Sequence, residues 1–180
     1  MFAGSVYLDR DPRLLLRAAA ITVRDLRLTP DAFRIAFIGD VGSPDGTDPS
    51  SIAAMSRDEG LAEFIQVTGF RPRSELRELL GKATVLVSLN QDSNMAIPSK
   101  IFEYMQYPAW LVALAEPGSA AELLLRDTAA DVVAPADTSA LADVLRRRYR
   151  QHERGEQPVR LSADARFSRR TQATLLFDAL

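Results

Sequence analysis

Short apolar segments alternate with amphipathic segments along the whole chain. The short segments are rich in β-branched and apolar residues, as strands covered on both faces should be. They are FAGSVY (2–7), FRIAFIG (33–39), FIQVTGF (64–70), TVLVSL (84–89), WLVALA (110–115) and DVVAP (131–135). Six strands that alternate with helices predict right-handed βαβ units. We therefore expect an α/β fold with one Rossmann-like, doubly wound parallel sheet, helices on both faces and the strand order 3-2-1-4-5-6.

Helix-start signals precede several of the amphipathic segments. Asp11-Pro12 stands before RLLLRAAAITVRDL, with proline in the first turn. Ser74 opens ELRELLGK, Asp137 and Thr138 precede SALADVLRRRY, and Ser119 to Glu122 form a capping box. These signals predict helices between the strands.

Residues 166–180, RFSRRTQATLLFDAL, form a last amphipathic segment. Helical spacing places Ala173, Leu176, Phe177 and Leu180 on one face. We expect a terminal helix that packs on its own domain or pairs with another copy of the chain.

Composition limits the class of protein. The 180 residues suffice for one domain, 1–180, with a sizeable core. A net charge of −2 and a pI of about 5.5 argue against general nucleic-acid binding. The chain has no cysteine, and its single histidine, His152, lies in a charged run. A zinc site or a Ser-His-Asp triad is therefore disfavoured.

We expect neither a membrane-spanning segment nor a signal peptide in this sequence. No apolar run approaches the ~20 residues that cross a bilayer, and MFAGSVYLDRD is no signal peptide. Met1 leads almost at once into a strand-like segment, which suggests a piece of a longer protein. We expect a cytoplasmic location and no membrane span.

Candidate chemistry lies in the loops after the strands, because ligands of such sheets bind at the carboxyl ends of strands. Arg10 follows the first strand, and the long loop NQDSNMAIPSK follows the fourth. Arg10, Lys100 and a helix N-terminus suit a phosphate or diphosphate. Glu103, one turn later, suits a sugar diol because a carboxylate accepts two hydroxyl hydrogens. The sequence has no G-x-G-x-x-G after the first predicted strand, which disfavours a dinucleotide dehydrogenase, and it has no P-loop motif.

The segment AIPSKIFEYMQY (96–107) predicts a helix with Ser99 as its N-cap. At 100° per residue one polar face is expected to hold Lys100, Glu103, Tyr104 and Tyr107. The opposite, core-facing side is expected to hold Ile101, Phe102 and Met105. The alternative is a solvated Lys100–Glu103 pair without further function.

Five segments in order resemble the C-terminal, donor-binding domain of family-4 (group 1) retaining glycosyltransferases with the GT-B fold. They are FAGSVYLDRDPRLLLRA, FRIAFIGD, VTGFRPRSEL, VLVSL and above all IPSKIFEYM. The resemblance runs from residue 2 to about 135 and more loosely through the terminal helix. It implies a hexosyltransferase of polysaccharide or glycoconjugate biosynthesis, which takes a nucleoside-diphosphate sugar and needs no metal or other cofactor. It also implies an N-terminal acceptor-binding domain, absent from this chain, without which the chain is expected to be inactive.

The resemblance also implies roles for particular residues. Glu103 matches the glutamate that holds the donor ribose, and Arg10, Ser99 and Lys100 are expected at the donor phosphates. Phe70 and Arg71 fall where the nucleobase packs. The donor-sugar loop is expected to comprise Asp92, Ser93, Asn94 and Met95.

Two positions depart from the family pattern. Met95 stands where many members have a second glutamate, and Ser5 stands where many have an arginine after the glycine that closes the first strand. The base, sugar, acceptor and oligomeric state stay open. The alternatives to a transferase domain are a domain of another GT-B-like enzyme, such as a nucleotide-sugar epimerase, and a degenerate, non-catalytic domain. Two of these residues also have an interpretation without a ligand. Arg10 could form a surface ion pair with Asp9 or Asp11, and Phe70 could belong to the hydrophobic core.

Overall fold

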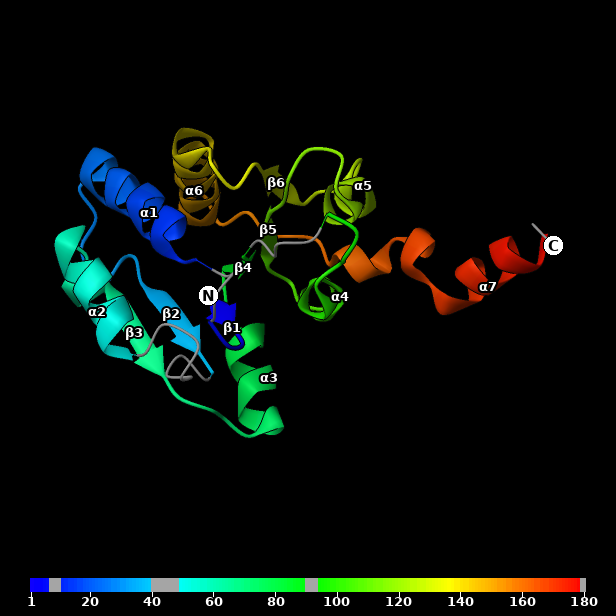
Figure 1. Cartoon of the computed structure of the whole chain (residues 1–180), viewed down its shortest axis with the longest axis horizontal. Helices are drawn as coiled ribbons and strands as arrows, with labels where there is room; N and C mark the ends of the chain where they lie inside the picture. Colours follow the sequence, from blue (N-terminus) through cyan, green and yellow to red (C-terminus); the bar gives the residue numbers. More distant parts are fainter. Residues whose placement is uncertain (7–10, 40–48, 90–93, 179–180) are drawn as a thin grey trace.

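The chain folds into alternating strands and helices (Figure 1). The structure is a computed structural model, and it describes residues 1–6, 11–39, 49–89 and 94–178. The strands are β1 (Phe2–Ala3), β2 (Ile35–Ile38), β3 (Ile65–Thr68), β4 (Val85–Ser88), β5 (Trp110–Leu114) and β6 (Asp131–Val133). The helices are α1 (Arg13–Leu26), α2 (Pro49–Asp58), α3 (Arg73–Gly81), α4 (Ser99–Tyr104), α5 (Ala120–Leu125), α6 (Thr138–Glu153) and α7 (Arg169–Asp178). Short 3-10 turns are η1 (Ala62–Phe64), η2 (Leu161–Ala163) and η3 (Ala165–Phe167).

The strands form two parallel three-stranded units, in the orders β1-β2-β3 and β4-β5-β6. Met1 joins them, because its amino nitrogen donates to the Val85 carbonyl at 2.7 Å and its carbonyl accepts from the Val87 N–H at 2.9 Å. This is the bonding pattern of a parallel pair, so β1 lies between β2 and β4. The resulting order is 3-2-1-4-5-6, as the sequence predicts.

Two hydrophobic clusters cover the two faces of the sheet. Neighbouring strand residues point to opposite faces, so Phe2, Phe37 and Val87 enter one cluster, and Ala3, Ile38 and Leu86 enter the other. Residues of α1, α2 and α6 complete the first cluster, in which α1 packs beside α6 (Figure 1). Residues of α3, α4 and α5 complete the second cluster. Because both faces of the sheet are buried, the strand sequences are continuous apolar segments rather than alternating apolar and polar residues.

The helix starts follow the capping signals in part. The Asp137 side chain accepts the Ala140 N–H at 2.8 Å, and the Ser119 hydroxyl accepts the Glu122 N–H at 3.3 Å. The Glu122 carboxylate in turn accepts the Gly118 N–H, and these two hydrogen bonds together form a variant of the capping box. The sequence pattern did not predict α2, whose Ile52 is fully buried.

Helix α7 extends away from the rest of the chain (Figure 1). Leu176 and Phe177 are 62% and 73% exposed, and Ala173 is exposed as well. Of the predicted apolar face, Leu180 lies outside the described residues. Three apolar side chains of α7 are therefore uncovered: Ala173, Leu176 and Phe177.

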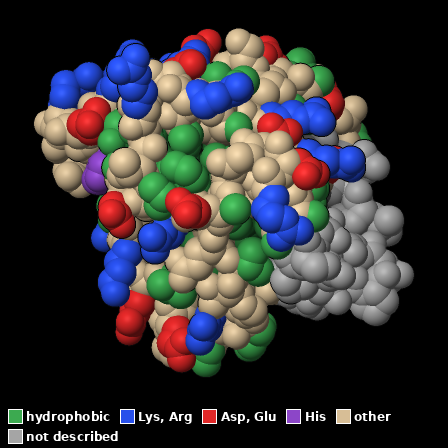
Figure 2. Space-filling view, turned by 90° about the vertical axis from the view of Figure 1, so that its left-hand side faces the viewer, with side chains coloured by type: hydrophobic (Ala, Val, Ile, Leu, Met, Phe, Trp, Pro, Cys, Tyr) green, Lys and Arg blue, Asp and Glu red, His purple; other side chains and the backbone are tan. Residues whose placement is uncertain are grey.

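The face in Figure 2 mixes basic and acidic side chains. Neither sign of charge gathers into one broad patch on this face. Within the described residues, no helix combines the length and the apolar character that a bilayer crossing requires.

Two glycines let the carboxyl ends of β1 and β2 approach each other. The Gly4 N–H donates to the Ile38 carbonyl at 2.7 Å, and the Gly39 N–H donates to the Thr68 carbonyl at 3.0 Å. Gly39 has a φ of +132°, and a Cβ added to it would lie 2.7 Å from the Gly4 carbonyl oxygen. Any side chain at position 39 therefore pushes β1 and β2 apart.

We expect Gly39→Ala to lower the free energy of unfolding by about 3 kcal/mol, the sum of backbone strain and overpacking. The control is Gly60→Ala, because Gly60 also has a positive φ, +73°, but no atom lies within 4 Å of its added Cβ. It should cost only about 1 kcal/mol. Urea unfolding measures both, and equal costs would contradict the close approach at Gly39.

Candidate functional site

The carboxyl ends of β1, β2, β3 and β4 meet at one edge of the sheet, and α4 begins beside them. Gly4 ends β1 there, and a Cβ added to it would lie 2.3 Å from the Lys100 amino nitrogen. The backbone of β1 and the side chain of Lys100 are thus in direct contact. This edge is where the sequence places the ligand.

Helix α4 differs from its sequence prediction in three respects. It begins at Ser99 with Pro98 as the N-cap and no side-chain cap, so Ser99 is not the N-cap. Proline at φ −56° and ψ 124° takes that position. Tyr104 is buried rather than on the polar face, and Phe102 is 45% exposed rather than in the core. Ile101 and Met105 are buried, as predicted.

Lys100 folds back onto β1. Its amino group donates to the Ala3 carbonyl at 2.9 Å and lies 4.1 Å from the centre of the Phe2 ring. A carbonyl oxygen and an aromatic face both stabilise a cation. Lys100 therefore brings a positive charge to the end of β1, beside Gly4.

The Tyr104 hydroxyl also binds the backbone of Ala3 in β1. It accepts the Ala3 N–H at 2.9 Å and donates to the Ala3 carbonyl at 3.1 Å. Tyr104 is 1% exposed, so this hydroxyl satisfies backbone groups that water does not reach. The tyrosine thus fixes α4 against the end of the central strand.

Glu103 follows Lys100 by three residues and is half-buried. No ion pair or hydrogen bond joins its carboxylate to another described side chain, so the structure does not show the Lys100–Glu103 pair that was the alternative. Burial, and then the Glu103 carboxylate, raise the pKa of Tyr107, and Arg77 and Arg73 oppose this shift.

Phe70 and Arg71 lie just after β3 at the same edge. Phe70 is 85% exposed, so its alternative place in the core is wrong. Arg71 makes a long ion pair with Glu75, 3.8 Å between nitrogen and oxygen, and lines a hollow of about 310 Å³ against α3. An exposed phenylalanine beside an arginine offers two flat groups on which a ring can stack.

The loop between β4 and α4 is described only in its second half. Asn94 is exposed and its carbonyl accepts the Ala120 N–H at 2.8 Å, which ties the loop to α5. Met95 is 89% exposed. Arg10, Asp92 and Ser93 lie outside the described residues. Within the described ranges, no three His, Cys, Asp or Glu side chains gather as metal ligands would.

The comparison with protein families decides the family. The family described as "Glycosyl transferases group 1" matches residues 1–151, most of the chain. The chain belongs to this family. A comparison with curated protein sequences gives no match.

Several solved structures of glycosyltransferases resemble this group 1 domain. WaaG, described as a glycosyltransferase of lipopolysaccharide biosynthesis, matches at 17% identity with a TM-score of 0.62, over 84% of this chain and 38% of WaaG. The C-terminal domain of LpcC from Francisella tularensis matches at 18% identity with a TM-score of 0.58, over 80% and 72%. HepE from Anabaena, solved with UDP, matches at 17% identity with a TM-score of 0.59, over 84% and 40%. The group 1 domain described here thus spans about two fifths of the length of WaaG and HepE.

Sequence reasoning missed the role of Tyr104 in this group 1 domain. Its partner, Ala3, is 101 positions away in the chain, and helical periodicity placed the side chain on the polar face. The sequence carried no signal for this contact, because the glycine directly after β1 makes room for the Lys100 side chain and not for the hydroxyl.

We expect Tyr104→Phe to lower the free energy of unfolding by about 1–3 kcal/mol, because it leaves the buried Ala3 N–H without an acceptor. Tyr107→Phe is the matched control, since Tyr107 is one turn further along and only partly buried. It should change stability by less than about 0.5 kcal/mol. Equal losses in the two variants, measured by thermal or urea unfolding, would contradict the role given to the Tyr104 hydroxyl.

Proposed function

We propose that this domain binds the nucleoside-diphosphate sugar donor of a retaining glycosyltransferase. The observation that carries the proposal is the position of Lys100 and Glu103 on successive turns of α4, next to the glycine that ends β1. A cation for a diphosphate and a carboxylate for a diol then lie at the edge of the sheet where such folds bind ligands. Membership of the group 1 family supports the same reading.

The diphosphate contacts are Lys100, Ser99 and Arg10. The exposed Ser99 begins α4, so its backbone N–H is one of those with no partner inside the helix. Because α4 has only six residues, the side chain of Lys100 rather than the helix dipole supplies most of the attraction. The Lys100 side chain is already held at this edge by its hydrogen bond to Ala3, so it loses less conformational entropy when the donor binds.

The ribose contact is Glu103, and the base lies by Phe70 and Arg71. The donor sugar lies along Asp92, Ser93, Asn94 and Met95. UDP bound to the similar HepE supports a nucleoside diphosphate as the ligand and makes UDP the first probe. Met95 in place of a carboxylate removes one pair of acceptors for sugar hydroxyls from that loop.

Sugar transfer requires a second, acceptor-binding domain, because positioning both substrates supplies much of the rate. This chain covers 38% of WaaG and 40% of HepE. We expect the isolated chain to bind the donor and to transfer no sugar.

Glu103→Ala should weaken UDP binding at least about tenfold, or ~1.4 kcal/mol. A carboxylate on the ribose makes charge-assisted hydrogen bonds of ~1.5–3 kcal/mol each. Calorimetry measures the change, and circular dichroism checks the fold. Glu103→Gln keeps one acceptor and should fall between wild type and the alanine variant.

Two controls separate ribose recognition from a general electrostatic effect. Glu63→Ala removes an exposed carboxylate from η1, just before β3 and so at the other edge of the sheet, and should leave UDP binding unchanged. The 2′-deoxy nucleotide should bind wild type more weakly than UDP and bind the alanine variant as well as UDP. The ribose role of Glu103 fails if wild type and Glu103→Ala show the same preference.

We also expect UDP to bind without a divalent metal, because cationic side chains offset the diphosphate charge at this edge. Calorimetry in EDTA and in Mg²⁺ or Mn²⁺ compares the two conditions. The affinity should agree within about twofold. Binding that appears only with metal would show that the diphosphate site is built differently.

A further inference from the structure

A small cavity of about 150 Å³ lies at the edge of the sheet opposite to the candidate site. Trp110, the first residue of β5, forms one wall, and Arg148 of α6 forms another. The segment that follows α6 supplies a further wall, which includes Glu156 and Leu161. The cavity thus lies between the start of β5, the end of α6 and the chain that comes after α6.

The indole ring of Trp110 distinguishes this cavity. The residue is only 6% exposed, and none of the described groups accepts a hydrogen bond from its indole N–H. Buried donors in folded proteins nearly always have a partner, so a donor without one calls for an explanation. Because Trp110 lines the cavity, a ligand held there can supply the acceptor.

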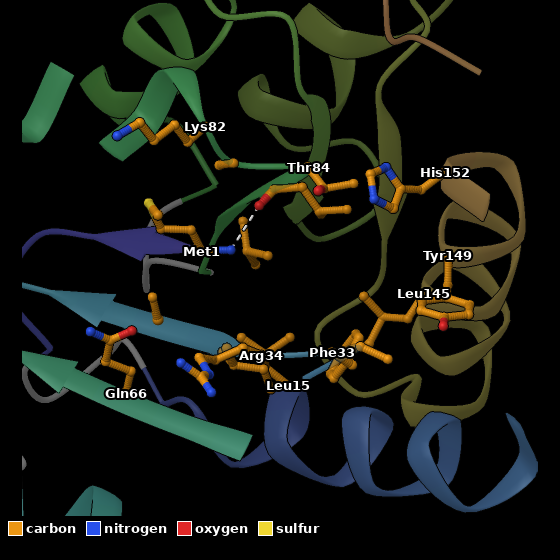
Figure 3. Close-up of a pocket in the computed structure, with 16 residues that line it drawn as sticks. Met1, Leu15, Phe33, Arg34, Gln66, Lys82, Thr84, Leu145, Tyr149 and His152 are labelled. Atoms are coloured by element: carbon orange, nitrogen blue, oxygen red, sulfur yellow. Dashed lines mark hydrogen bonds between the residues drawn. The ribbon is translucent and has the colours of Figure 1, made fainter. Parts of the chain in front are cut away.

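The larger cavity of about 360 Å³ in Figure 3 holds no such group among its described side chains. It lies at the starts of β2 and β4, beside Leu145 and Tyr149 of α6. The polar side chains that line it, among them Lys82 and His152, are exposed or only partly buried, so water reaches them. The unsatisfied donor at Trp110 therefore points to the smaller cavity.

Arg148 supplies further donors to the smaller cavity. Its side chain is 12% exposed, and its guanidinium lies 5.5 Å from the centre of the Trp110 ring. Nε donates to Asp131 at 2.6 Å, and the two terminal nitrogens donate to the Gln151 side chain at 2.8 Å and to the Ala129 carbonyl at 3.3 Å. A guanidinium carries five N–H groups, so two of them have no acceptor within the part of the chain that the structure describes.

The ion pairs around the cavity leave a positive charge there. Asp131 is 8% exposed and accepts from both Arg147 and Arg148. Glu156 pairs with Arg154, and the hydrogen bond from Arg154 holds the pKa of this carboxyl below its usual value. Three arginines therefore face two carboxylates in this network. An anion suits the remaining charge better than a neutral molecule or a cation does.

We propose that this cavity binds a short aliphatic carboxylate of about four carbons. The two oxygens of a carboxylate only accept hydrogen bonds, so they suit the unsatisfied N–H groups of Trp110 and Arg148. The alkyl end lies against Pro158, Val159 and Leu161. A cavity of this volume encloses about six non-hydrogen atoms, which is the size of butyrate. The site is separate from donor binding and does not rest on the proposed function.

The test uses the single tryptophan of the chain, whose indole N–H gives one cross-peak in a proton–nitrogen correlation NMR spectrum. Butyrate should move this cross-peak downfield with a Kd of about 1 mM, because the N–H gains an acceptor. Butyramide has the same shape without the charge and should bind at least about tenfold more weakly. N-acetylvaline carries its carboxylate on a peptide-like body too large for the cavity and should also bind at least about tenfold more weakly. Butylammonium at the same ionic strength should cause no shift.

Substitutions in the full chain test the two donors separately. Arg148→Lys keeps the charge but loses the planar fork of N–H groups, so butyrate should bind at least about tenfold more weakly. Arg150→Lys is the matched control and should leave the affinity unchanged, because Arg150 is exposed on the same helix and does not line the cavity. Trp110→Phe keeps an aromatic ring and removes the N–H, so the rise in Tm that butyrate causes should fall at least about twofold.

Circular dichroism checks the fold of each variant. The proposal is overturned if butyrate leaves the indole cross-peak in place, if butyramide or N-acetylvaline binds as tightly as butyrate, or if the two lysine variants lose the same affinity. Should Arg148→Lys fail to fold, Trp110→Phe decides, and an equal rise in Tm for this variant and wild type overturns the proposal as well.

Discussion

Residues 1–4 join the two halves of the sheet through backbone hydrogen bonds, at the edge where the candidate site lies. Met1 bonds to β4 and Gly4 bonds to β2, so the halves β1-β2-β3 and β4-β5-β6 meet along this short strand. The groups assigned to the donor are divided between the halves. Lys100 and Glu103 follow β4, whereas Phe70 follows β3. Under the proposed function, donor binding would depend on this junction as well as on the side chains that touch the ligand.

The backbone of Ala3 is where the junction and the candidate site coincide. Its carbonyl accepts from both the Lys100 amino group and the Tyr104 hydroxyl, and its N–H donates to the same hydroxyl. The tyrosine satisfies buried backbone groups, so its contribution is to stability. The hydrogen bond to Ala3 orients the lysine charge, and under the proposed function this charge would attract the diphosphate. The backbone of this one residue thus connects folding with the proposed recognition.

The architecture could be predicted from sequence because both faces of the sheet are covered. All six strands appear where apolar segments predict them, although each is shorter, since turns and glycines end the pairing before the apolar run ends. Helix α2 was missed because few of its side chains reach the core. Tyr104 and Phe102 were assigned to the wrong sides because α4 packs against β1, a neighbour that is distant in sequence. The predicted N-cap, Ser99, is wrong by one residue, because the fixed φ of Pro98 already sets the backbone for a helix that begins at Ser99.

The contact between Gly4 and Lys100 has a consequence for how this sequence can change. A methyl group on Gly4 would occupy the place of the lysine amino nitrogen, and a lysine that leaves this place also leaves the Ala3 carbonyl and the Phe2 ring. The two positions therefore act as one unit, and the effect of a substitution at either depends on the residue at the other. A relative with a side chain at the position of Gly4 must place the amino group of its lysine elsewhere. Covariation between positions 4 and 100 would record this exclusion.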